Sequence, residues 1–146
     1  MKKLALVLIL AIISLVLVFA SAKEDEMENA AIKQAALDYI EGWYEGSMER
    51  MDRALHPDLD KKGVQIIPQT GKTILNHLRK TNMVEYTRAG AGKNEEKKSK
   101  VEVVILDVFK NMASVKTVSP DFVDYLHLVR SEGQWKIVNV LWEPNK

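Results

Sequence analysis

The stretch that decides the fold lies near the C-terminus and reads Asp121-Phe122-Val123-Asp124-Tyr125-Leu126-His127-Leu128-Val129-Arg130, followed by a turn through Gly133 and then Trp135-Lys136-Ile137-Val138-Asn139. Both runs are rich in β-branched and aromatic residues, which favours strands. A short polar segment containing glycine separates them, so we expect an antiparallel hairpin. Asp124 alternates with Phe122, Leu126 and Leu128 along the first strand, so this acid is expected to lie on one face with apolar neighbours.

Two more runs of the same character come before this hairpin. They cover residues 101–109 and 113–118, and the short turn signals Lys110-Asn111 and Ser119-Pro120 set them apart. Runs of this length joined by short turns are typical of an antiparallel meander. We therefore predict four consecutive strands at residues 101–109, 113–118, 122–129 and 135–142.

The residues before residue 60 have a helical period instead. Ile32, Ala36, Tyr39 and Trp43 are spaced at i, i+4, i+7 and i+11, which predicts an amphipathic helix over residues 27–45. Ser47 is a good N-cap for a second, shorter helix that ends at His56-Pro57, because a residue before proline is pushed out of the helical region.

Between these helices and the meander the signals are weaker. Residues 58–69 are expected to form a loop with a short strand at residues 64–67, and a third helix is expected from about Lys72 to Lys80. Residues 87–100 are small, charged and glycine-containing, which predicts a mobile loop with a solvated charge run. Helices first and sheet after is an α+β arrangement, with helices on one face of a curved sheet.

The N-terminus has the parts of a secretory signal peptide. Two lysines come first, an almost unbroken apolar run covers residues 4–19, and the small residues Ala20-Ser21-Ala22 precede a polar segment. We expect cleavage before Lys23, which leaves residues 23–146 as a single exported domain, periplasmic or secreted. The alternative is an uncleaved membrane anchor, since residues 4–22 are long enough to cross a bilayer.

Composition and charge limit the function classes. The chain has 146 residues, of which 28% are charged and 47% hydrophobic, and these values are ordinary for a globular protein. Without the leader's two lysines, 19 basic residues face 20 acidic ones, so no excess of positive charge points to nucleic acid. The absence of cysteine excludes disulfides, thiolate metal sites and lipid attachment at a cysteine.

The long early helix, the short helix ending in His56-Pro57 and the Asp-Tyr-x-x-Leu strand with its Gly turn and Trp-Lys-Ile-Val strand together resemble the nuclear transport factor 2-like superfamily. The resemblance covers about residues 28–144 and is closest to the branch named "putative lumazine-binding", a neighbour of the SnoaL-like polyketide cyclases. It implies a cone-shaped fold with three helices wrapped by a strongly bent antiparallel sheet, a pocket between them, and a homodimer through the outer sheet face. The superfamily holds both enzymes and non-enzymes, so the fold alone does not select a function.

Two residues are candidates for acid–base chemistry. Asp124 lies among apolar neighbours on its strand, where a buried carboxyl suits a general base, as in the isomerase-type members of the superfamily. The alternative is a structural carboxylate paired with a backbone amide or with a base such as Arg130. His56 is a second candidate base or ligand contact, and its alternative is a cap on the end of the helix. In an enzyme, Tyr125 or Tyr39 would donate to a developing oxyanion.

Aromatic residues are the candidates for ligand contact. Tyr39, Trp43, Trp135 and Trp142 would stack a flat ligand, or they would serve as plain core. Together with His56 and Asp124, we take Tyr39, Trp43 and Trp142 as the candidate binding residues. No metal-ligand spacing is present, and we expect neither a metal nor a cofactor.

Three functions stay open from the sequence. The first is an exported domain that binds a small apolar or aromatic molecule without catalysis. The second is an isomerase, dehydratase or cyclase of the SnoaL-like kind, using Asp124 or His56. The third is a homodimeric protein-interaction module whose apolar sheet face pairs with a second copy.

Overall fold

The computed structural model describes the backbone of residues 2–145 and the side chains of residues 22–145. The chain divides into two compact units, Met1–Ala30 and Ala31–Lys146, and helix α1 (Lys2–Glu45) runs through the boundary. The predicted leader over residues 1–22 lies, except for Ala22, outside the residues whose side chains are described. Among the residues whose side chains are described, no helix is both long enough and apolar enough to span a membrane.

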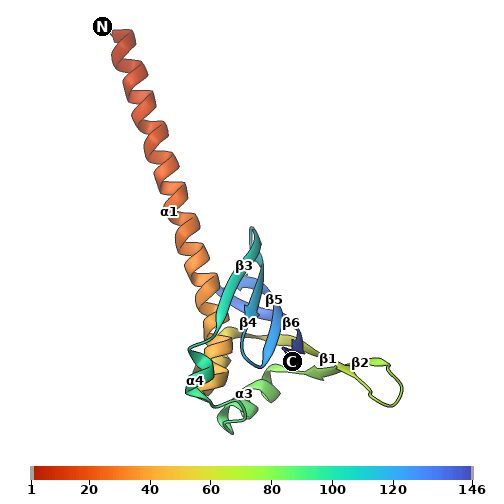
Figure 1. Cartoon of the computed structure of the whole chain (residues 1–146). Coiled ribbons are helices and arrows are strands. Elements are labelled where there is room, and N and C mark those ends of the chain that lie inside the picture. The colour runs from red at the N-terminus through yellow and green to blue at the C-terminus, as the bar shows by residue number, and fades with distance from the viewer. Residues whose placement is uncertain (1, 146) are drawn as a thin grey trace. The chain divides into compact units, whose positions relative to one another are not determined.

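The second unit holds the site, and its elements follow one another as Figure 1 labels them. After the end of α1 come α2 (Met48–Ala54), β1 (Leu55–Ile66), β2 (Thr73–Leu78), α3 (Lys80–Arg88), α4 (Glu95–Lys98), β3 (Glu102–Phe109), β4 (Met112–Val118), β5 (Phe122–Ser131) and β6 (Gln134–Pro144).

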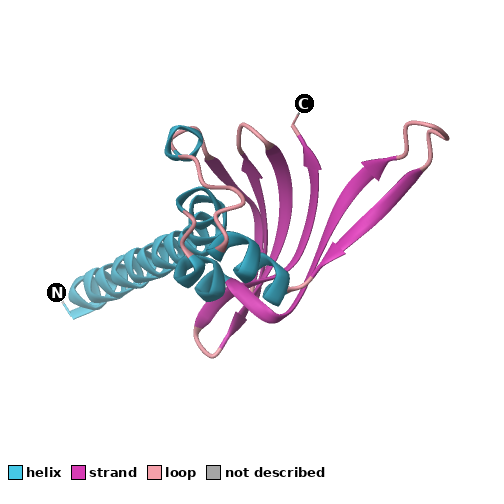
Figure 2. Cartoon of the chain, turned by 90° about the horizontal axis from the view of Figure 1, so that it is seen from below, coloured by secondary structure: helices cyan, strands magenta, loops and turns pink. Residues whose placement is uncertain are grey.

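The strands form one six-stranded sheet in the order β2-β1-β6-β5-β4-β3. Every neighbouring pair is antiparallel except β1 and β6, which are parallel. Figure 2 shows the strands of this sheet bending, with the helices gathered on one side. The predicted α+β fold and the predicted meander of β3 to β6 are confirmed.

The core lies between the helices and one face of the sheet. On α1 the predicted stripe is buried at Ile32, Ala36 and Tyr39, and Leu126 and Ile137 face it from β5 and β6. Alternation in the middle of β5 buries Asp124, Leu126 and Leu128, as a one-sided sheet requires. The end of α1 is held to α2 by Arg50, which pairs with Asp38, Glu41 and Glu45.

The predicted helix at residues 72–80 is wrong, because Thr73–Leu78 is strand β2 and the helix begins at Lys80. The apolar spacing of Ile74, Leu75 and Leu78 fits a helix, but Ile74 and Leu75 are exposed on the hairpin. Gly71 has φ 65° in the turn between β1 and β2, a conformation that favours glycine and brings Thr73 opposite Ile66. The turn at Gly71, and not the helical spacing of the apolar residues, therefore determines that this segment is a strand.

Two other segments also differ from prediction. Residues 58–69 were expected to be mostly loop, but β1 begins at Leu55 and continues to Ile66. Pro57 is tolerated because it falls where the β1–β6 pairing shifts register, between Leu55 and Asp60. The predicted mobile loop at residues 87–100 contains α4, and its charge run is not merely solvated, since Lys98 pairs with Glu45 at 2.8 Å.

Candidate functional site

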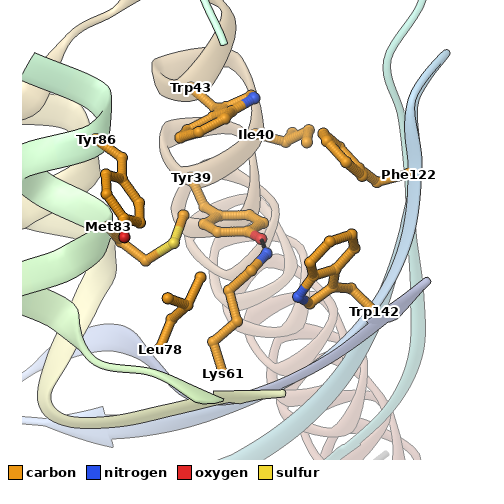
Figure 3. Close-up of a pocket in the computed structure, with 9 residues that line it drawn as sticks. All are labelled: Tyr39, Ile40, Trp43, Lys61, Leu78, Met83, Tyr86, Phe122 and Trp142. Carbon is orange, nitrogen blue, oxygen red and sulfur yellow. Dashed lines mark hydrogen bonds between the residues drawn. The ribbon is translucent and has the colours of Figure 1, made fainter. Parts of the chain in front are cut away.

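A small cavity opens between the end of α1, α3 and the buried face of the sheet. Its volume is about 130 Å³. Figure 3 shows the side chains around it, and five of the nine are aromatic. The lining residues are Tyr39, Ile40, Trp43, Lys61, Leu78, Met83, Tyr86, Phe122 and Trp142.

Strand register builds the sheet side of this cavity. Thr117, Asp124, Trp142 and Gly63 are consecutive cross-strand partners on β4, β5, β6 and β1, so their side chains share one face. Lys61 lies two residues before Gly63 and therefore projects from the same face. The indole of Trp142 lies over Gly63, where an added Cβ would come 2.7 Å from Cε2 of the indole. Glycine at position 63 thus allows the indole to pack directly against β1.

A buried network of polar side chains lies at the base of the cavity. The Tyr39 hydroxyl donates to Asp124 Oδ1 at 2.8 Å, and the Lys61 ammonium lies 3.2 Å from the same oxygen. Thr117 donates to Asp124 Oδ2 at 3.2 Å, and Lys61 also donates to the Tyr39 hydroxyl. Asp124 is fully buried and Lys61 is 7% exposed, so this is an ion pair removed from water.

Burial sets the protonation of this network. Loss of hydration lowers the pKa of the Lys61 ammonium, while the charge of Asp124 and its hydrogen bond oppose that shift. Burial also raises the pKa of the Tyr39 hydroxyl well above its usual value, and the Asp124 charge raises it further. Tyr39 is therefore a neutral hydrogen-bond donor, and Lys61 is a cation that loses its proton more readily than an exposed lysine.

The aromatic walls surround the lysine. The Lys61 Nζ atom lies 4.9 Å from the ring centre of Trp142 and 5.0 Å from that of Tyr39, within the range of cation–π attraction. Phe122 meets Trp142 edge to face with ring centres 5.1 Å apart. Among the described residues, the indole Nε1 of Trp142 is buried without a hydrogen-bond partner. Figure 3 shows this nitrogen on the side of the ring that faces Lys61.

The structure brings together most of the residues singled out from the sequence. Tyr39, Trp43 and Trp142 line the cavity, and Asp124 lies behind its wall, bonded to Tyr39 and Lys61. His56 is not among the lining residues; it is at the start of β1, where its Nδ1 accepts from the Asp58 amide at 3.1 Å.

The other aromatic candidates lie elsewhere. Trp135 is part of the buried core, and Tyr125 is 48% exposed, so Tyr125 is not placed to donate to a group in the cavity.

Sequence reasoning missed Lys61, Met83 and Tyr86. Lys61 lies in a run of charged residues, Asp60-Lys61-Lys62, where nothing distinguishes the inward lysine from the outward one except strand parity. The sequence predicts a loop at this point of β1, and a loop gives no alternation from which to tell which lysine points inward. The basic partner of Asp124 shown by the structure is Lys61, rather than the suggested Arg130. Within residues 22–145, no group of three or more metal-ligating side chains comes together.

Comparison with known proteins agrees with this fold. The family model described as "Putative lumazine-binding" matches residues 27–143. A search of curated proteins finds no match.

Solved structures show the same architecture. An NTF2-like protein of unknown function from Shewanella baltica aligns with a TM-score of 0.64 at 19% identity, covering 82% of this chain and 95% of that one. A second NTF2-like protein of unknown function, from Silicibacter pomeroyi, aligns with a TM-score of 0.64 at 16% identity, covering 83% and 98%. A "Putative Scytalone Dehydratase" from Novosphingobium aromaticivorans aligns with a TM-score of 0.55 at 15% identity, covering 86% and 89%. The chain therefore has the NTF2-like fold and belongs to the family described as "Putative lumazine-binding".

Proposed function

We propose that this protein binds a small, uncharged molecule with one aromatic ring in the cavity beside Lys61. The observation that carries the proposal is the cavity itself, with rings of Tyr39, Trp43, Tyr86, Phe122 and Trp142 around about 130 Å³. An apolar protein cavity of roughly 150 Å³ is known to take benzene, whereas drug-sized ligands occupy about 300–1,000 Å³. The size therefore favours one ring with a short substituent.

The charges at the cavity favour a neutral ligand. The Lys61 ammonium is already balanced by Asp124 and faces the rings of Tyr39 and Trp142. A cationic ligand would be repelled by this ammonium although aromatic walls usually attract cations. An anionic ligand would give up its hydration without finding a lysine free of a partner.

The same geometry supports binding over acid–base catalysis. Both carboxylate oxygens of Asp124 already accept hydrogen bonds, from Tyr39, Lys61 and Thr117, and Asp124 is not among the lining residues. A general base needs to reach the proton it removes. The isomerase, dehydratase or cyclase alternative becomes the better description if purified protein turns over a substrate and Asp124→Asn abolishes that turnover while the fold is kept.

Titration with benzyl alcohol, followed by tryptophan fluorescence, tests the binding proposal. Tyr86 and Tyr125 make a matched pair, because they are 46% and 48% exposed but only Tyr86 lines the cavity. Tyr86→Ala should weaken binding several-fold, and Tyr125→Ala should leave it unchanged. Lumazine, named in the family description, serves as a larger, two-ring probe. Equal affinity in wild type and both variants would contradict the proposal.

We also propose a homodimer through the outer sheet face. Val104, Lys116, Tyr125 and Leu141 are consecutive cross-strand partners on β3 to β6, and three of them are apolar and exposed. Exposed apolar patches of this kind often mark protein contacts. Sedimentation should give a dimer at micromolar concentration that Tyr125→Glu dissociates; a monomeric wild type would contradict it.

Export remains a proposal that rests on residues 1–22. It is tested by the N-terminal sequence of the protein purified from its own host. A chain beginning at Lys23 would support cleavage of a signal peptide, and a chain that keeps residues 1–22 would support the membrane anchor.

A further inference from the structure

Lys61 has features that simple ligand binding does not explain. It is a buried lysine on the wall of an otherwise apolar cavity, and its Nζ lies between the rings of Tyr39 and Trp142. Proteins rarely bury a lysine fully, because its charge loses hydration there. A lysine desolvated in an apolar pocket is also the form in which the amine becomes a nucleophile toward carbonyl groups.

A proton acceptor lies within reach of this amine. Asp124 Oδ1 is 3.2 Å from Nζ, which is longer than the roughly 2.7–2.9 Å usual for an ammonium on a carboxylate. The same oxygen accepts the Tyr39 hydroxyl at 2.8 Å. Burial lowers the pKa of Lys61, so transfer of its proton to Asp124 costs less than it would for an exposed pair.

A second observation points to a ligand with an acceptor oxygen. The buried indole N–H of Trp142 has no partner among the described residues, and an unsatisfied buried donor costs about 1–3 kcal/mol. Figure 3 shows this nitrogen on the edge of the ring next to the Lys61 side chain, and it is packed against Gly63, where an added Cβ would lie 2.8 Å from it. A carbonyl group beside Lys61 would present its carbon to the amine, and its oxygen would reach the indole N–H when the indole turns away from Gly63.

We propose that the ligand of this cavity is an aromatic aldehyde with one ring and that Lys61 binds it reversibly as an imine. Lys61 gives a proton to Asp124, and the free amine forms a bond to the carbonyl carbon as the carbonyl electron pair moves to oxygen. The Tyr39 hydroxyl, which lines the cavity and is hydrogen-bonded to Asp124, gives its proton to this oxygen and takes up the proton held by Asp124. Loss of that oxygen as water, with one proton from nitrogen, leaves the carbon–nitrogen double bond. The reaction releases one water, and no oxidant or reductant is needed.

This inference rests on the proposed ligand cavity, and trapping with a reductant tests it directly. The protein as its host produces it is incubated with benzaldehyde and cyanoborohydride, and the modified lysine is located by peptide mass spectrometry. We expect a mass increase of one benzyl group at Lys61, suppressed by excess benzyl alcohol, which has the same ring without the carbonyl. Lys62→Arg should keep the label because Lys62 pairs with Asp60 and does not line the cavity. Lys61→Arg should lose it.

The outcomes separate the two proposals. If benzyl alcohol and benzaldehyde both bind but Lys61 carries no label, the imine is overturned and the ligand cavity stands. If neither compound binds, both proposals are overturned. Labelling of surface lysines alone, insensitive to benzyl alcohol, also overturns the imine. Because the peptide map of the wild-type protein locates the label by itself, the test does not depend on whether Lys61→Arg folds.

Discussion

Removing the charge of Asp124 should destabilise the fold strongly, and by an amount that depends on pH. Asp124→Asn keeps the shape of the side chain but leaves the Lys61 ammonium buried without a counter-charge. Breaking a buried ion pair in this way costs about 3–5 kcal/mol. The protein can instead release the Lys61 proton, and from an ordinary pKa of 10.5 this costs about 5 kcal/mol at pH 7, at 1.36 kcal/mol for each pH unit. Both routes place the penalty at about 3–5 kcal/mol at pH 7.

Release of the Lys61 proton makes the penalty depend on pH, which loss of packing alone would not do. At pH 9 the cost of releasing the proton falls to about 2 kcal/mol, so the penalty of Asp124→Asn should shrink as the pH rises. Urea unfolding at pH 7 and pH 9, followed by circular dichroism, measures both values. Asp52→Asn is the control, since Asp52 is an exposed carboxylate that pairs with Lys80 and should cost only about 1 kcal/mol at either pH. A penalty below about 1 kcal/mol for Asp124→Asn, equal at the two pH values, would refute the buried pair.

Three further perturbations test the parts around this site. Gly63→Ala places a Cβ 2.7 Å from the Trp142 indole, so it should lower the free energy of unfolding by about 1–3 kcal/mol and weaken benzyl alcohol binding. Gly71→Ala has open space around it, so it should lower the free energy of unfolding by about 1 kcal/mol through its positive φ alone and leave binding unchanged. Burial by itself would raise the pKa of Asp38, but hydrogen bonds from Arg53, Arg50 and Gln34 outweigh it and hold the pKa below 3.8. The ionised Asp38 therefore stabilises the fold above pH 3.8, and this stabilisation is lost as the pH falls through the lowered pKa. Asp38→Asn should lower the free energy of unfolding by about 2 kcal/mol at pH 7 and remove part of this acid dependence, as measured by urea unfolding. Tyr44→Phe removes a hydroxyl bonded to Ser119 and Asp121 at 3.0 Å each and should lower the free energy of unfolding by about 1–2 kcal/mol; an unchanged urea midpoint would contradict those bonds.

The sheet was predictable because its strands carry a strong local signal. Residues 101–142 are rich in β-branched and aromatic residues and are divided by short turns, so this pattern alone places β3 to β6 within a few residues. The hairpin of β1 and β2 was not predictable in the same way. Leu55–Ile66 contains a proline and five charged or histidine side chains, and its strand character comes from pairing with β6, far away in the sequence.

The site residues, too, are only partly predictable from the sequence. Tyr39, Trp43 and Trp142 could be found because aromatic residues on a buried stripe are visible in the sequence. Lys61 could not, because its role depends on a register that places it on the same face as Trp142 and Asp124. The sequence places His56 at the end of a helix, but it lies where β1 begins, and its Nδ1 accepts from the Asp58 amide.

The most direct test of the central claim is a crystal structure of the protein soaked with benzyl alcohol. The account predicts one ring bound among Tyr39, Trp43 and Trp142, with Lys61 still paired to Asp124. An unoccupied cavity under the same soak, or a ring bound only outside these side chains, would contradict it.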